Sequence, residues 1–251
     1  CYVYMYRHFR ILRSSPEESQ FQVKLARHLM NIGVPMGLQF SITAIGSIML
    51  QSANNALGTA CVAAFTSGVR IKMFFICPFE SLGIAMATYC GQNYGAGKPG
   101  RIWKGIKSSS GMMMVYAMAT FILLRFGATW LALLFVDSSE TEIIRNTELF
   151  LQVSSYFFPA LGLLCILRYT IQGAGYTNLA MLSGVSEMIA RALISLYAVP
   201  AFGYIAVCYG DPTAWMAADV FLIPAFVWVY HRLKKMAYCP GSDKTAADCS
   251  G

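Results

Sequence analysis

Charged residues are scarce in this chain. Asp, Glu, Lys and Arg make up 12% of its 251 residues, whereas a soluble domain typically has about 25%. Hydrophobic residues make up 57%, and the mean hydropathy is +0.53. These values exclude a soluble globular domain. They are typical of a protein with several membrane-spanning helices.

The sequence also lacks the residue patterns of common catalytic and metal sites. Its histidines, His8, His28 and His231, are far apart, and its eight cysteines have no C-x-x-C spacing. The segment Gly95–Gly100 fits G-x-G-x-x-G, but it follows a membrane span and not a strand, so it does not predict a dinucleotide site. We therefore expect no catalytic residue, no bound metal and no organic cofactor, and the protein is not expected to be an enzyme.

Six apolar stretches are long enough to cross a bilayer, which takes about 20 residues. They cover residues 29–58, 62–90, 109–136, 149–171, 179–209 and 213–230. Four prolines inside them predict kinks, because proline removes a backbone hydrogen bond from the helix. These are Pro35, Pro78, Pro159 and Pro224. The sequence thus predicts an all-α, polytopic membrane protein with six transmembrane helices.

The net charge of +7 would suit a nucleic-acid partner, but the positions of the basic residues explain it differently. Twelve of them flank the spans on one predicted side: Arg7, Arg10, Arg13, Lys24, Arg27, Lys98, Arg101, Lys104, Lys107, Arg232, Lys234 and Lys235. The loops on the other side contain Arg125 and Arg145 among three acids. By the positive-inside rule the basic side is cytoplasmic. We therefore expect both termini in the cytoplasm and no nucleic-acid partner.

The two ends of the chain differ from its apolar middle. Residues 1–6 look like the end of a preceding transmembrane helix, and residues 7–28 form a polar linker expected at the cytoplasmic surface. The six-helix unit spans 29–235, and the polar tail 236–251 is expected to be disordered. Because the chain starts with Cys1 and not Met, we expect it to be a fragment.

The first span has a polar stripe and a pair of small residues. Four polar side chains fall within about 80° of one another on a helix of 100° per residue: Gln39, Thr43, Ser47 and Asn54. The stripe is either a helix contact or the wall of an aqueous transport cavity. Gln51 widens it beyond what one contact needs, which favours the cavity. Gly33 and Gly37 predict close packing against another helix.

Ionisable groups at membrane depth cost at least about 2.5 kcal/mol each unless they are paired or hydrated. The predicted spans contain Arg70, Lys72, Glu80, Glu187, Arg191 and Asp219. Glu187 and Arg191 are one turn apart, so they either neutralise each other or take part in ion coupling. Glu80 has no basic partner one turn away, which makes it the likelier titrating group. Asp219 either caps a polar cluster or binds a cation.

Several short motifs together resemble one protein family. Gly91, Gln92, Asn93, Gly95 and Ala96 end the second span, with Lys98 and Arg101 following. Gln172-Gly173-x-Gly175-Tyr176 lies between the fourth and fifth spans, and Trp215 precedes Asp219 in the sixth. In this order and spacing, residues 29–231 resemble the C-terminal half of the multidrug and toxic compound extrusion (MATE) transporters.

The resemblance implies one six-helix lobe of a twelve-helix transporter in the cell membrane, with a missing N-terminal lobe as its partner. Such transporters export organic cations and drugs by alternating access, driven by H⁺ or Na⁺. Some members have acidic cation ligands in the first and fourth helices of this lobe. Here the first span has no acid and the fourth has Glu148 at its outer edge, so Glu80 becomes the local coupling candidate.

Two other functions stay open. A flippase for lipid-linked oligosaccharides or lipids of the same superfamily would favour a cavity rich in Arg and Lys, whereas the basic residues here lie mainly in loops. A six-helix membrane enzyme or sensor would need clustered His, Asp or Cys side chains near one membrane surface. The sequence contains no such cluster.

Overall fold

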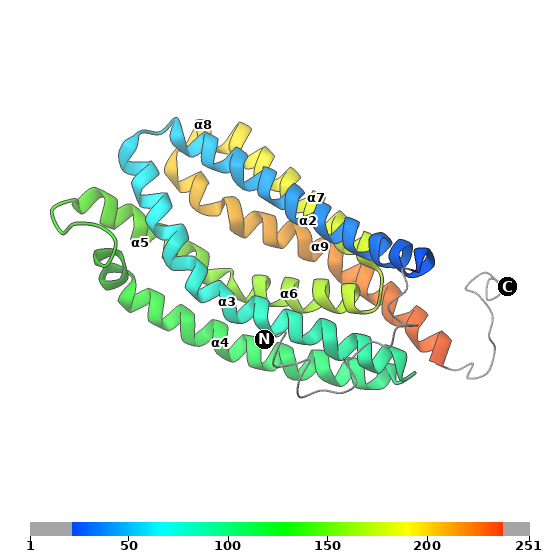
Figure 1. Cartoon of the computed structure of the whole chain (residues 1–251). Helices are drawn as coiled ribbons and strands as arrows, with labels where there is room; N and C mark the ends of the chain where they lie inside the picture. The colour runs from blue at the N-terminus through cyan, green and yellow to red at the C-terminus, as the bar shows by residue number, and fades with distance from the viewer. Residues whose placement is uncertain (1–21, 238–251) are drawn as a thin grey trace, which may run out of the picture.

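A computed structural model describes residues 22–237, which are helical apart from short turns (Figure 1). The elements are α2 (Val23–Asn55), α3 (Thr59–Gly95), α4 (Pro99–Leu133), α5 (Thr141–Tyr156), α6 (Phe158–Gly173), α7 (Thr177–Leu193), the π-helix η2 (Ile194–Ala198), α8 (Val199–Phe202) and α9 (Tyr204–Ala237). Within this range there is no strand. Five helices are long and apolar enough to cross a membrane, and the bent pair α5–α6 makes a sixth. The predicted all-α, six-span architecture is confirmed.

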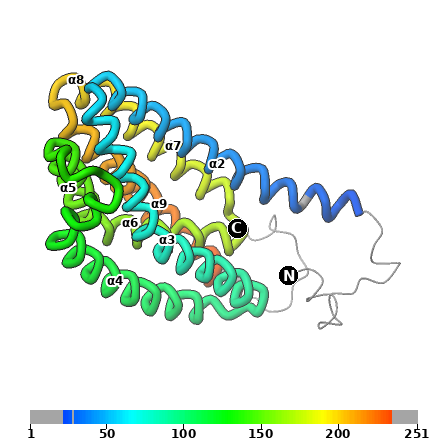
Figure 2. Tube along the Cα trace, turned by 60° about the vertical axis from the view of Figure 1, so that its left-hand side comes forward, coloured from blue at the N-terminus to red at the C-terminus, as the bar shows by residue number. Residues whose placement is uncertain are grey.

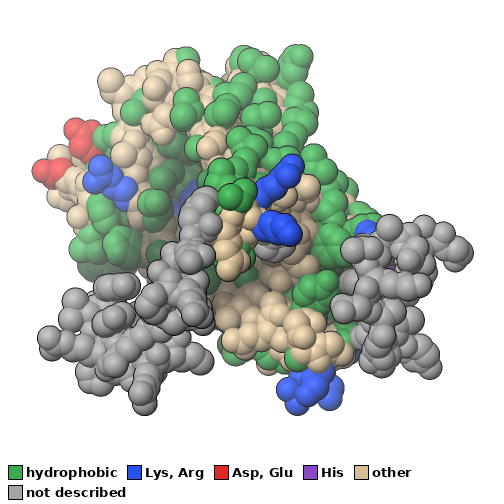
Figure 3. Space-filling view, turned by 45° about the vertical axis from the view of Figure 1, so that its right-hand side comes forward, with side chains coloured by type: hydrophobic (Ala, Val, Ile, Leu, Met, Phe, Trp, Pro, Cys, Tyr) green, Lys and Arg blue, Asp and Glu red, His purple; other side chains and the backbone are tan. Residues whose placement is uncertain are grey.

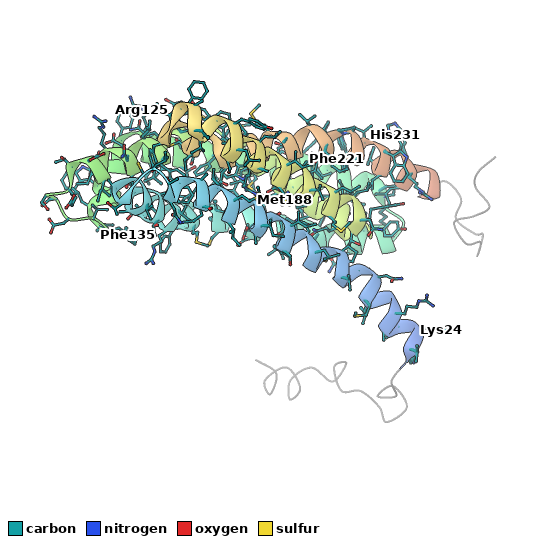
Figure 4. The ribbon with its side chains drawn as sticks, turned by 90° about the horizontal axis from the view of Figure 1, so that it is seen from above. Lys24, Arg125, Phe135, Met188, Phe221 and His231 are labelled. Atoms are coloured by element: carbon teal, nitrogen blue, oxygen red, sulfur yellow. The ribbon has the colours of Figure 1, made fainter. Side chains whose placement is uncertain are left out.

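The helices form a bundle in which several of the most extensive contacts join helices that are far apart in sequence (Figures 1 and 2). α2 packs on α7, α7 on α9, and α3 on α6, while α4 packs on α3 and α5. The N-terminal half of α2 leaves the bundle, as the position of Lys24 in Figure 4 shows. Apolar side chains there are exposed, including Leu29 at 60% and Leu38 at 48%.

The fourth span is broken. α5 and α6 meet at Phe157 and are bent by 53°. Pro159 occupies the first turn of α6, where its missing N–H costs no helical hydrogen bond. The kink predicted at Pro159 is confirmed, and the bend gives α6 a direction different from that of α5.

The predicted boundary between the fifth and sixth spans is wrong. The fifth span ends at Phe202 and the sixth begins at Tyr204, with the turn at Gly203. Gly203 has a φ of 60°, a conformation that glycine adopts without strain. The prediction treated the polar residues Asp211 and Pro212 as a loop. Both lie inside α9, because the charge of Asp211 is neutralised by partners from other helices.

Glycines mark the closest helix contacts, though not those that the sequence indicated. A Cβ at Gly33 or Gly37 would meet nothing within 4 Å, so neither packs closely against the described residues. α2 instead approaches α7 further along. A Cβ on Gly46 would lie 3.1 Å from Met188 Cα, and one on Gly184 would lie 3.1 Å from Gln39 Cγ.

The two ends of the bundle differ in charge. The α3–α4 turn, the start of α2 and the end of α9 lie at one end, which we call the basic end; the α4–α5 loop lies at the other (Figure 1). Figure 3 shows Lys and Arg side chains in separate groups between broad hydrophobic areas. Val23 and Ala237 both lie at the basic end, as an even number of spans requires.

Candidate functional site

Five charged side chains, three of them buried and two partly buried, form a continuous ion-pair network across four helices. Lys72 of α3 pairs with Asp211 of α9. The other carboxylate oxygen of Asp211 lies 3.0 Å from Arg191 Nε of α7, and Arg191 Nη1 lies 3.3 Å from Glu187 Oε2. Glu187 Oε1 pairs with Arg168 of α6. None of the five side chains is more than 14% exposed.

Local structure places each member of this network. Glu187 and Arg191 are one turn apart on α7 and therefore lie on the same face. Arg168 Nε donates a hydrogen bond of 3.2 Å to Ser183 Oγ, one turn before Glu187. The Lys72 ammonium lies 4.7 Å from the ring centre of Phe150 and 5.8 Å from that of Trp215. Aromatic faces thus stabilise this buried cation beside its carboxylate.

The predicted Glu187–Arg191 pair is present, but it belongs to a larger network. Sequence reasoning missed Arg168 and Asp211. Arg168 lies within the apolar stretch 149–171, so the cost of a charge at membrane depth could have identified it. Asp211 was missed because the predicted boundary between the fifth and sixth spans placed it in a loop. A buried pair alone is weak evidence of function, since neutralisation explains it. Mutual neutralisation explains a network of three cations and two acids less well, because the charges do not cancel.

Asp219 lies near this network on α9 and has an unused hydrogen-bonding atom. The residue is 7% exposed, and its Oδ1 has no hydrogen-bond partner. The Arg168 guanidinium interacts with it electrostatically without a direct bond. One turn earlier, the ring of Trp215 packs on Phe158 with the ring centres 6.3 Å apart. Asp219 is therefore a desolvated acid that interacts electrostatically with a guanidinium.

Glu80 lies apart from the network. It is exposed, and it forms no ion pair with any other described residue. It is electrostatically close to Cys165 and Tyr169 of α6. Arg70 is also exposed and lines a surface hollow together with Phe135 and Val136, which follow α4.

The polar stripe of α2 divides into two parts. Gln39 is buried and accepts a hydrogen bond of 2.7 Å from Gln172. Asn54 is buried and donates to the carbonyl of Cys61 over 3.3 Å. Thr43 faces Gly184 of α7. These three residues serve contacts within the lobe, as the helix-contact interpretation holds.

The rest of the stripe is more open. Ser47 is exposed and donates to the carbonyl of Thr43 over 3.2 Å, and Gln51 is half-buried. The cavity interpretation stays a prediction, and Ser47 and Gln51 are the members of the stripe for which no contact between helices is described above. On α2, the side chains that point away from α7 are the ones available for contact with another protein unit.

The Gly91–Ala96 motif builds the end of α3. Asn93 is buried, its Nδ2 donates to the carbonyl of Tyr89 over 2.8 Å, and its own carbonyl accepts from Lys98 N over 2.9 Å. A Cβ on Gly91 would lie 3.3 Å from the carbonyl oxygen of Gly173. The two glycine motifs of the sequence therefore meet in space, where α3 and α6 pack closely. Gln92 is exposed beside them.

No group of three or more potential metal ligands occurs within residues 22–237. Glu148 is held by hydrogen bonds from Thr129 Oγ1 at 3.1 Å and Gln152 Nε2 at 2.8 Å. The cysteines described, 61, 77, 90, 165 and 208, are free thiols. The charged groups that the fold brings together at membrane depth are those of the ion-pair network and Asp219.

The fold and these motifs can be compared with known proteins. A family model named MatE matches residues 23–197. The chain belongs to the MATE family. The resemblance read from the glycine motifs is thus confirmed, and the family is one of transporters rather than enzymes.

Two curated relatives come from Bacillus subtilis (strain 168). The chain is 25% identical over 147 residues to "Probable multidrug resistance protein YpnP" and 24% identical over 147 residues to "Probable multidrug resistance protein YoeA". Each alignment covers 59% of this chain, but 33% of YpnP and 31% of YoeA. The match to this chain thus covers about a third of the length of each of these two relatives.

Solved MATE structures share the fold over nearly the whole chain. A MATE transporter in complex with MaL6 superposes with a TM-score of 0.79 at 18% identity, covering 95% of this chain and 54% of the other. An outward-facing multidrug resistance MATE transporter of the MOP superfamily gives 0.78 at 18% identity, covering 97% and 54%. The chain therefore has the fold of about half of a MATE transporter.

Proposed function

We propose that this chain is the C-terminal six-helix lobe of a multidrug efflux transporter that exports organic cations across the cell membrane. The observation that carries the proposal is the match of nearly the whole chain to about half of each solved MATE fold. Relatives named as probable multidrug resistance proteins support the substrate class. Transport by alternating access then requires the second lobe as a partner, since one lobe cannot enclose a cavity.

The site for that partner is the exposed part of α2. Between Val23 and Leu38 most of its large apolar side chains are exposed. Ser47 and Gln51 add polar groups on the same helix. We assign this helix to the wall of the transport cavity, with the missing lobe facing it.

Transport is driven by H⁺ or Na⁺ and needs no cofactor. The intramembrane acids Glu80, Glu187 and Asp219 are the coupling candidates, with Arg191 as a charge partner. The basic end of the bundle faces the cytoplasm, following the positive-inside rule. This end holds both Val23 and Ala237.

A flippase for anionic lipid-linked substrates is less well supported. It would need cations free to bind phosphate inside the lobe. The buried cations Lys72, Arg168 and Arg191 are each paired with a carboxylate. An anionic substrate would therefore have to compete with these carboxylates for each of the three cations.

The test is gradient-driven transport of a fluorescent cation. The intact transporter that contains this chain is reconstituted into proteoliposomes, and ethidium movement is followed under an imposed H⁺ or Na⁺ gradient. We expect transport against the ethidium gradient that stops when the ion gradient is dissipated. Liposomes without protein are the control. Ethidium movement that is unchanged when both gradients are dissipated contradicts the proposal.

A further inference from the structure

The charges of the buried network do not balance. Lys72, Arg191 and Arg168 are three cations, whereas Asp211 and Glu187 are two carboxylates. An uncompensated charge at membrane depth is costly. Asp219 can supply the missing negative charge, because it is buried on α9, which packs on α6, the helix that carries Arg168. Its protonation state therefore decides whether the six groups together are neutral or carry one positive charge.

Asp219 has the position and the surroundings of a proton-binding group. It is the middle residue of the span Tyr204–Lys234, which places it near the centre of the bilayer. One oxygen, Oδ1, lacks a hydrogen-bond partner although the residue is 7% exposed. A buried carboxyl oxygen without a donor is expensive unless the group can be protonated or another donor can reach it.

α6 and α7 both pack on α9 and carry charged groups of the network. α6 contributes Arg168 and the thiol of Cys165, which both interact electrostatically with Asp219. α7 contributes Glu187 and Arg191 behind Arg168, joined to it through the ion pairs. Glu80 of α3 also interacts electrostatically with Cys165. Arg168 thus interacts with two carboxylates, with Glu187 through an ion pair and with Asp219 electrostatically.

We propose that Asp219 binds the coupling proton in this lobe and that Arg168 transmits its protonation state to the ion-pair network. When Asp219 is ionised, it attracts the guanidinium away from Glu187. When it holds a proton, Arg168 is held by Glu187 and Ser183, as in this structure. One proton is taken up from the side of higher proton concentration and released on the other, and no covalent bond apart from that O–H changes.

This inference rests on the proposed function, and Arg168 acts in it as a positioning residue. Because Glu187 also holds Arg191 and, through it, Asp211, a change at Asp219 reaches α6, α7 and α9 together. A shared network of this kind can bias two arrangements of the lobe. Proton-coupled transport requires such a link between the protonation state of one group and the arrangement of the lobe.

The experiment uses the intact transporter in proteoliposomes and the variant Asp219→Asn. The amide keeps the shape of the protonated acid but cannot ionise. We expect exchange of ethidium without a gradient to persist, whereas pH-gradient-driven transport falls by about tenfold or more, the scale of a typical coupling factor. The pH dependence of ethidium binding should flatten. The inference is overturned if Asp219→Asn has the same pH profile and the same gradient-driven transport rate as the wild type.

Arg168 variants separate positioning from simple stability. Arg168→Gln should move the midpoint of the pH profile to higher pH, because a nearby cation no longer favours the ionised carboxylate. Arg168→Lys, which keeps the charge, should restore the midpoint toward that of the wild type. Arg168→Gln with an unmoved midpoint contradicts the role assigned to Arg168. Glu140→Gln, in the exposed α4–α5 loop, is the matched control.

The double variant Arg168→Gln/Asp219→Asn covers the case in which a single variant does not fold. It removes one cation and one acid, so the four remaining network charges balance. We expect it to fold and to lack pH coupling; full coupling overturns the inference. If neither the single variants nor the double variant folds, Asp219→Glu is tested instead. A pH profile of transport with a shifted midpoint in Asp219→Glu supports the inference, and an unmoved midpoint contradicts it.

Failure of the proposed function looks different. In that case the wild type does not transport ethidium under either gradient. Proton binding at Asp219 is then read from the unfolding temperature of the wild type, which should depend on pH, and from that of Asp219→Asn, which should depend on it less. Equal pH dependence of the two proteins overturns the inference.

Discussion

The side-chain nitrogen of Gln172 donates a hydrogen bond of 2.7 Å to the side-chain oxygen of Gln39, joining the end of α6 to α2. Gln39 stands where α2 changes from an exposed helix to one packed on α7. Gln172 opens the Gln-Gly-x-Gly-Tyr motif at the turn between α6 and α7. The motif thus helps to fix the point from which the exposed half of α2 leaves the bundle.

Gln39→Ala should destabilise the lobe by about 1–3 kcal/mol, because it leaves the buried amide of Gln172 without its partner. Unfolding of the purified protein in detergent measures this effect. Ser47→Ala, on the exposed part of the same helix, is the control and should have little effect. Equal stabilities of the two variants would show that the amide contact contributes nothing.

Gly173→Ala should destabilise the packing of α3 on α6. A methyl group at this position would overlap the backbone carbonyl of Ala87, which cannot move aside as a side chain can. Overpacking typically costs about 1–3 kcal/mol, so a lower melting temperature and a lower yield of folded protein are expected. Gly127→Ala, on the open side of α4, is the matched control. A Gly173→Ala protein as stable as this control contradicts the packing described.

Asp211→Asn should be strongly destabilising, by about 3–5 kcal/mol, because it leaves Lys72 buried without its carboxylate and weakens the hold on Arg191. Adding Lys72→Met restores the original net charge of the network. The double variant should therefore recover part of the lost stability in thermal unfolding. If the stability losses of Asp211→Asn and Lys72→Met simply add in the double variant, Asp211 and Lys72 are not energetically coupled.

Glu80→Gln should lower the rate of gradient-driven ethidium transport without affecting membrane insertion or folding. Glu80 is exposed and has no ion pair among the described residues, so its removal leaves no buried partner unpaired. Transport in proteoliposomes and the amount of protein in the membrane are measured together, with Glu140→Gln as control. A transport rate equal to that of the wild type removes Glu80 from the mechanism.

The orientation of the lobe can be tested with single cysteines. Lys98→Cys at the basic end should resist a membrane-impermeant maleimide in intact cells, whereas Ser138→Cys in the α4–α5 loop should react. All native cysteines are replaced beforehand. Permeabilised cells give the maximum labelling of both positions. The reverse pattern places the basic end outside.

Much of the fold follows from the sequence, because apolar length and the placement of basic residues are strong signals. Six spans and the kink at Pro159 were predictable. The boundary near Gly203 was not, since Asp211 and Pro212 are typical of a loop in local sequence. Three-dimensional pairing with Lys72 and Arg191 makes a helix possible there.

The candidate site was only partly predictable. The Glu187–Arg191 pair is local on one helix, so spacing alone reveals it. The links from Arg168 to Glu187 and from Lys72 to Asp211 join residues 19 and 139 positions apart, which spacing cannot reveal. The same holds for Gln39, whose partner Gln172 is 133 positions away.

The common position of Val23 and Ala237 at the basic end has a consequence for how such a unit can be duplicated. A unit that returns to its starting side can be followed in one polypeptide by a second copy with the same polarity, and no additional crossing helix is needed between them. A reporter protein attached through either end would also reside in the same compartment. Tandem duplication and fusion are therefore topologically simple for this lobe.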